Sequence, residues 1–205
     1  MKTPDPAKVV DGGSRIGIHF TERARGPANG LDAHLFGIFH DKFLARMAEL
    51  PCGGRFGALA GGASAATFTG KLEEPRNSMV GRDFSVAIPA APEGDSLGYA
   101  LIIDEAAFGS YSGGGREIAT GVALAGGGVA AAVVAGSSNS ISSREEFKFV
   151  LWDYRAQAAL AYGIARLKVK EKDGESGEFD ADSKGLQRFF AERLFADQCR
   201  QAPRR

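Results

Sequence analysis

The fold is decided by Glu145-Glu-Phe-Lys-Phe-Val-Leu-Trp-Asp-Tyr154 and by Leu160-Ala-Tyr-Gly-Ile-Ala-Arg-Leu-Lys-Val-Lys170, which are joined by the short link Arg155-Ala-Gln-Ala158. In the first run, successive side chains alternate between two sets, with Phe147, Phe149 and Leu151 set against Lys148, Val150 and Trp152. A period of two residues is typical of a strand that has one buried face. Two such runs with a short polar link predict an antiparallel hairpin near the C-terminus.

Further strands are indicated upstream of this hairpin. The run Tyr99-Ala-Leu-Ile-Ile103 continues to Phe108 and is almost continuously apolar, which predicts a central strand buried on both faces. The shorter candidate strands are residues 15–20, 55–60 and 84–88. The Gly-, Ser-, Ala- and Thr-rich stretch that follows residue 60 is ambiguous. Residues 70–82 carry charges and Pro75, and we expect a surface loop or a poor helix there.

Two amphipathic helices are expected to cover the sheet. Residues 31–50 place apolar side chains at helical spacing and are closed by Pro51 and the Gly53-Gly54 pair. Residues 183–198 form the second helix, with an Asp182 or Ser183 cap. Its apolar face consists of Leu186, Phe189, Phe190 and Leu194.

Together these elements predict an α/β (α+β) fold. A mixed sheet of about five strands carries both helices, and the C-terminal hairpin is followed by the second helix. Residues 15–198 are expected to form one domain, interrupted by a Gly/Ala-rich excursion at residues 112–143. Residues 1–14 and 199–205 are expected to be flexible.

Composition excludes several classes of protein. The 205 residues are 44% apolar and include 14 Phe, enough to form a packed core. Lys plus Arg (25) equal Asp plus Glu (25), so no net field attracts a polyanion, and we expect no nucleic-acid partner.

The cysteines and the N-terminus bear on the compartment. Cys52 and Cys199 are the two cysteines, and a single disulfide and two buried free thiols are both compatible with the sequence. Residues 1–13 have neither a basic region nor an apolar core of a signal peptide. We therefore expect either a chain whose signal has been removed or a cytoplasmic protein.

The excursion contains 26 consecutive residues without a charge, from Ile118 to Ser143. Gly126-Gly-Gly128 would break a membrane-spanning helix in its middle. Three interpretations stay open: a loop or strand extension packed on its own chain or a neighbouring subunit, a membrane-inserting β-hairpin in an assembled ring, and a short buried helix. The residues expected to contact a partner are Val122, Leu124, Val129, Ala131, Val133 and Val134.

One candidate for enzymatic chemistry is an acidic pair. Asp104 and Glu105 end the apolar run and could converge with Asp153 for acid/base work, while Ser110 or Ser112 would supply a nucleophile. An acidic pair at a strand end is more often a solvated edge, and no GxSxG motif is present.

Cofactor and metal sites are not expected. The stretch Ser112-Gly-Gly-Gly-Arg-Glu117 matches neither nucleotide-binding glycine motif, and a flexible turn is the better interpretation. His34 and His40 are six residues apart on a helix, so they lie on different faces, and His19 lies in a strand.

The hairpin resembles a pattern found in bacterial envelope lipoproteins, in which a strand with acidic residues precedes a hairpin of alternating apolar residues that ends in an aromatic residue and Asp. Here Tyr99-Ala-Leu-Ile-Ile-Asp-Glu105, Phe147-Lys-Phe-Val-Leu-Trp-Asp-Tyr154 and Leu160-Ala-Tyr-Gly163 carry it. The first strand and the two helices also resemble the domain shared by the TolB N-terminal module and the periplasmic region of the curli secretion channel. The chain departs from lipoproteins in having no lipobox cysteine.

The resemblance implies a non-enzymatic, periplasmic or outer-membrane-associated domain that oligomerises or docks in envelope assembly. Its partners would be other envelope proteins or further copies of itself, with membrane association as an alternative and no cofactor. Two rival functions are a small-molecule hydrolase using Asp104 and Glu105, and a soluble ligand-binding module.

Overall fold

The computed structural model describes residues 14–25, 33–62, 64–72, 78–93, 97–112, 140–172, 179–196 and 199. Within this part, a five-stranded sheet has the order β2-β1-β5-β6-β7, and β3 and β4 form a separate two-stranded ribbon. The strands are β1 (Arg15–Phe20), β2 (Phe56–Ala58), β3 (Ser64–Lys71), β4 (Asp83–Pro89), β5 (Leu97–Ser112), β6 (Ser140–Asp153) and β7 (Ala158–Lys172). The helices are α1 (Glu22–Arg25), α2 (Ala33–Ala48), the short 3-10 helix η2 (Gly53–Arg55) and α3 (Asp180–Arg193).

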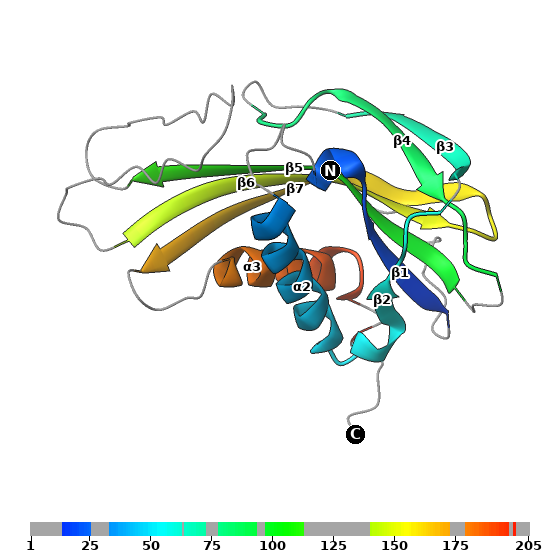
Figure 1. Ribbon diagram of the computed structural model, residues 1–205, viewed down its shortest axis with the longest axis horizontal. Coiled ribbons are helices and arrows are strands. Elements are labelled where there is room, and N and C mark those ends of the chain that lie inside the picture. The colour runs from blue at the N-terminus through cyan, green and yellow to red at the C-terminus, as the bar shows by residue number, and fades with distance from the viewer. Residues whose placement is uncertain are drawn as a thin grey trace.

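The expected fold class is confirmed. The central strand is β5, which runs parallel to β1 and antiparallel to β6, so the sheet is mixed. The expected C-terminal hairpin is β6 and β7, and α3 follows it. Figure 1 shows α2 and α3 on one face of the sheet and the ribbon β3–β4 over the other.

The helix-covered face holds an aromatic core. Phe39 of α2 is fully buried and its ring stacks on Phe147 of β6, with 5.6 Å between ring centroids. Phe43 stacks on Phe39 and also contacts Phe190 of α3. The phenylalanine-rich faces of the two helices thus meet on the sheet, as the spacing predicts.

The opposite face of the sheet is covered by the ribbon. Phe84, Val86 and Ile88 alternate inward along β4 and pack on Ala100, Ile102, Val150 and Trp152. Phe68 of β3 contacts Tyr162 of β7, with 5.0 Å between ring centroids. Because both faces of β5 are buried, its apolar run is almost continuous, as expected for a central strand.

The stretch after residue 60, which the sequence leaves ambiguous, forms β3 and extends through Gly70 and Lys71. On the inward side of β3, Phe68 stands between Ala66 and Gly70, so the apolar alternation of this strand is weak. The described residues 72 and 78–82 belong to no helix or strand, which agrees with the loop expected at residues 70–82. The second helix begins at Asp180 and not at residue 183: Phe179, with φ of 57°, accepts the backbone N–H of Ser183, and Asp182 and Ser183 are buried within the helix.

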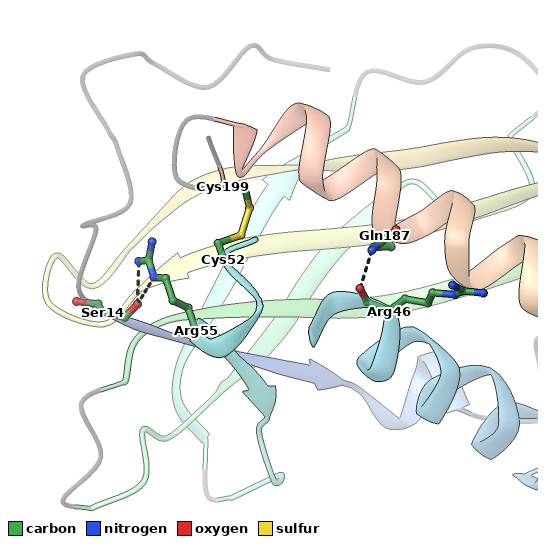
Figure 2. Close-up of a disulfide and its surroundings, with 6 residues drawn as sticks. All are labelled: Ser14, Arg46, Cys52, Arg55, Gln187 and Cys199. Carbon is green, nitrogen blue, oxygen red and sulfur yellow. Dashed lines mark hydrogen bonds between the residues drawn. A yellow bond between two sulfur atoms is a disulfide. The ribbon is translucent and has the colours of Figure 1, made fainter. Parts of the chain in front are cut away.

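The C-terminal region is tied to the end of α2. Cys52 and Cys199, whose pairing the sequence leaves open, form a disulfide with 4.7 Å between their Cα atoms (Figure 2). Nearby, Gln187 of α3 donates a hydrogen bond of 2.6 Å to the carbonyl of Arg46. Arg55 donates two hydrogen bonds to the carbonyl of Ser14, just before β1. Covalent and polar contacts therefore join the first strand, α2 and α3 at one end of the molecule.

Candidate functional site

The sequence predicts that the central strand ends at Asp104 and Glu105, but the strand continues past both residues. A β-bulge between Ile103 and Glu105 interrupts the pairing of β5 with β6, and β5 then continues to Ser112. The Asp104 side chain is 5% exposed, and its carboxylate lies 3.3 Å from Arg23 Nη1. The hydroxyl of Thr21 lies 2.7 Å from the carbonyl oxygen of Asp104.

Burial raises the pKa of Asp104, and the charges of Arg23 and Lys148 together with the Thr21 hydrogen bond only partly oppose this rise. Asp104 therefore links α1 and its flanking Thr21 to the central strand. Its carboxylate is enclosed by these contacts and does not form the solvated edge that was expected.

Glu105 forms a buried ion pair with a residue that sequence reasoning did not select. Lys148 is fully buried, and its Nζ lies 2.8 Å from Glu105 Oε2. The same ammonium donates to the carbonyl of Asp83 at 2.9 Å and stands 5.7 Å from the centre of the Phe84 ring. Lys148 thus connects the sheet to the first residue of β4. Its charge is balanced by the carboxylate of Glu105, which lies directly opposite it in the β5–β6 pair.

Glu146 accepts hydrogen bonds on both oxygens of its carboxylate. Its Oε2 accepts hydrogen bonds from Ser78 Oγ at 2.6 Å and from the Met79 N–H at 2.8 Å. Its Oε1 accepts from Arg144 at 2.6 Å and from Arg166 at 3.1 Å. Burial of the fully enclosed Glu146 opposes ionisation, but these hydrogen bonds outweigh it and lower its pKa to about 2.

The structure does not bring Asp153 to the other two acids. Asp153 pairs with Tyr99 at one end of the β5–β6 pair, whereas Glu105 pairs with Lys148 near the middle of the pair. Its Oδ1 accepts the backbone N–H groups of Arg155 and Ala156, so this carboxylate closes the β6–β7 turn. The register of β5 with β6 therefore keeps Asp153 away from Asp104 and Glu105, and the expected convergence of three carboxylates is wrong.

The candidate nucleophiles lie further along β5. The backbones of Ser110 and Ser112 continue the strand, opposite Ser143 and Ile141 of β6, and their side chains lie outside the described residues. Within the described part of the chain, no group of three or more His, Cys, Asp or Glu residues is arranged to hold a metal ion. Nor is any helix there long and apolar enough to cross a membrane.

Asp104, Glu105 and Glu146 form, with their cationic partners, a buried ionic cluster. This cluster stabilises the strands that lead to the excursion. Glu146 lies opposite Ala107, and it holds residues 78–80, which precede β4, against the sheet. Gly109, two residues further on, faces Met79 so closely that a Cβ added there would lie 3.0 Å from the Met79 sulfur. The ribbon is thereby fixed on β5 and β6 shortly before these strands reach residues 113–139.

The expected partner-contacting residues, Val122, Leu124, Val129, Ala131, Val133 and Val134, lie outside the described residues. The structure does describe the two strands on which this segment begins and ends. Ser112 of β5 is paired with Ile141 of β6, so the chain leaves and returns at adjacent positions of one antiparallel pair. In Figure 1 these ends of β5 and β6 lie beyond the ribbon.

Sequence reasoning missed Glu146 and Lys148. A signal was available, because Glu146 and Lys148 stand two residues apart beside the apolar residues 147 and 149–152, and this spacing puts both charges on one face of the strand. If that face is covered, the charges need partners from the covering element. The missing information was that β3 and β4 form this cover.

No protein-family model, curated protein or solved structure matches this chain. The resemblance to the TolB N-terminal module and the curli channel domain therefore stays a prediction.

Proposed function

We propose that this protein is a non-enzymatic interaction or assembly domain of the bacterial cell envelope, located in the periplasm or at the outer membrane, which presents residues 112–143 to its partner. The supporting observation is the placement of this segment. It joins two adjacent, registered strands, carries no charge over 26 residues, and starts where a buried ionic cluster braces the sheet. A rigid base with an uncharged extension suits contact with other envelope proteins or further copies of the chain, or with a membrane.

The state of the buried acids supports a non-enzymatic role. Asp104, Glu105 and Glu146 are each engaged by a cation, and their hydrogen bonds hold separate elements together. A catalytic carboxylate must instead be able to reach the group whose proton it transfers. The cluster thus performs a structural task that is independent of any substrate.

The disulfide supports the envelope location. Disulfides persist in oxidising compartments such as the bacterial periplasm and are rare in reducing cytosol. Cys52 and Cys199 are separated by 147 positions in the sequence, so their pairing closes most of the chain into one loop. A domain held in this way is suited to the periplasm.

The test is the mass of the full chain in solution, measured by light scattering with and without detergent micelles. We expect a defined oligomer or an association with detergent, and the loss of that association when residues 113–140 are replaced by a two-residue Asn-Gly turn between Ser112 and Ile141. Circular dichroism and thermal unfolding of the same deletion variant establish that the sheet is intact.

A point variant refines this experiment. Ala131→Arg places a charge in the middle of the segment and should reduce association while leaving the melting temperature unchanged. Ala45→Arg, at an exposed position of α2, is the matched control and should associate as the wild type does. A strict monomer that ignores detergent, or full association by the deletion variant, would refute the proposal.

A further inference from the structure

The outer edge of β7 is the feature that the proposed function does not use. β7 pairs with β6 along one side and is the last strand of the sheet, and no described strand pairs with its other side. An edge of this kind presents a row of N–H and C=O groups that can pair with another strand. Natural sheets usually protect such edges with charged side chains, above all lysine.

The charged side chains that could protect the outer edge occupy only the C-terminal half of β7. Arg166, Lys168 and Lys170 occupy its C-terminal half, and Arg166 and Lys168 are exposed. Residues 161–165, Ala-Tyr-Gly-Ile-Ala, carry no charge and lie before Arg166. On the N-terminal side this run is bounded by the irregularity at Leu160, where the pairing with β6 shifts between Leu151 and Trp152.

We propose that a second copy of this chain pairs with this edge, β7 against β7, in an antiparallel register centred on Gly163. The part of the uncharged stretch that follows the irregularity, residues 161–165, is centred on the same residue, so this register aligns it with its own copy. Tyr162 then faces Ile164 of the second copy, which gives two pairs of an aromatic and a β-branched residue, a favourable combination across strands.

The charges favour the same register. Pairing about Gly163 places Arg166 opposite Leu160 at both ends of the contact, so no cation faces another. A register centred on Arg166 would place the two Arg166 side chains opposite each other, and one centred on Leu167 would oppose Arg166 and Lys168, which is unfavourable. The basic half of β7 therefore restricts the pairing to its uncharged half.

The other edge of the sheet explains why the contact is two-fold. Head-to-tail pairing would join β7 of one copy to β2 of the next, but β2 has only three residues, Phe56–Ala58. Pairing of identical edges is closed by a two-fold axis and needs no second surface. Because only a short run is paired, we expect a weak, concentration-dependent dimer.

Disulfide trapping tests the register directly in the full chain. Gly163→Cys places two thiols opposite each other on the two-fold axis, and a Cβ at this position meets only the Phe149 ring, at 3.8 Å. With oxidised glutathione as the oxidant, we expect a covalent dimer in non-reducing gels. The native cysteines are already paired, so the new thiol is the one available.

Ala161→Cys is the matched control, because residue 161 of the two copies would lie about 14 Å apart in this register, beyond the Cα separation that a disulfide permits. Cross-linking of Gly163→Cys alone supports the proposal. Cross-linking of both variants, or of neither, overturns it.

Sedimentation over a range of concentrations gives a second readout that needs no cysteine. Ala161→Lys, at a half-buried position, should weaken dimerisation at least about tenfold, whereas Ala58→Lys on the opposite edge should leave it unchanged. A wild-type chain that stays monomeric throughout overturns the inference.

The chain that lacks residues 113–140 separates the two surfaces. The β7 dimer should persist in this variant even though association through the excursion is gone. Loss of dimerisation in it would refute pairing through β7 while leaving the proposed role of the excursion in place.

Discussion

Replacing Glu146 by Gln is the most direct test of the buried brace. The variant keeps the shape of the side chain but removes the charge, and one of its terminal atoms becomes a donor that faces other donors: either Ser78 and the Met79 N–H, or Arg144 and Arg166. The pKa of Glu146 falls from its ordinary value of 4.5 to about 2 in the folded protein. At about 1.4 kcal/mol per pKa unit, ionised Glu146 contributes about 3 kcal/mol to the free energy of unfolding at pH 7.

The sign of the pH dependence follows from the lowered pKa. The contribution is fully present above pH 4.5 and is lost as the pH falls toward 2, because below that value both the folded and the unfolded states are protonated. By pH 3 about 2 kcal/mol of it should be gone. The difference between wild type and Glu146→Gln should therefore shrink by about that amount between pH 7 and pH 3.

Urea unfolding of both proteins at several pH values measures this difference, and comparing them cancels the titration of all other carboxylates. Glu192→Gln, at an exposed position of α3, is the control and should change the free energy of unfolding by less than about 0.5 kcal/mol. A Glu146→Gln effect that is small at pH 7, or equally large at pH 3, would show that the hydrogen bonds do not stabilise the ionised form.

Two further predictions concern the same framework. Asp104→Asn should change the free energy of unfolding at pH 7 by less than about 1 kcal/mol in urea titrations. Burial raises the pKa of Asp104, so its ionised form is stabilised less in the folded protein than in the unfolded chain. A loss as large as that of Glu146→Gln would contradict this prediction. The free energy of unfolding of the double variant Cys52→Ala with Cys199→Ala should be about 4 to 5 kcal/mol lower than that of the wild type, since the disulfide closes a loop that spans 147 positions. Adding a reductant should lower the stability of the wild type but not that of the variant.

The elements that the sequence predicts well are those whose periodicity is set by a single large apolar face. The β6–β7 hairpin alternates clearly because Phe147, Phe149 and Leu151 all face the helix layer. The phenylalanines of α2 recur at helical spacing for the same reason. Where a strand has one large apolar residue among small ones, as β3 has Phe68 between Ala66 and Gly70, the pattern carries too little contrast to distinguish a strand from a loop.

The errors at the candidate site have one physical origin. Residue type alone suggests that Asp104 and Glu105 end a strand, because charges normally reach solvent there. The bulge at this point allows the strand to continue. Arg23 and Thr21 then enclose Asp104, and the ribbon supplies the carbonyl of Asp83 to Lys148. Partners that come from residues distant in the sequence, such as Arg23 and Ser78, cannot be inferred from local spacing.

The placement of the charges explains why a buried ionic cluster is kept where an apolar core would be at least as stable. Glu105 faces Lys148 directly across β5 and β6, and Glu146 faces Arg166 directly across β6 and β7. A slip of one residue between either pair of strands would turn these side chains to the helix-covered face and leave them without partners. The cluster thus fixes the register of the three long strands. Both proposed contact surfaces depend on that register, because it sets where residues 113–139 leave the sheet and which residues of β7 lie before the protective cations.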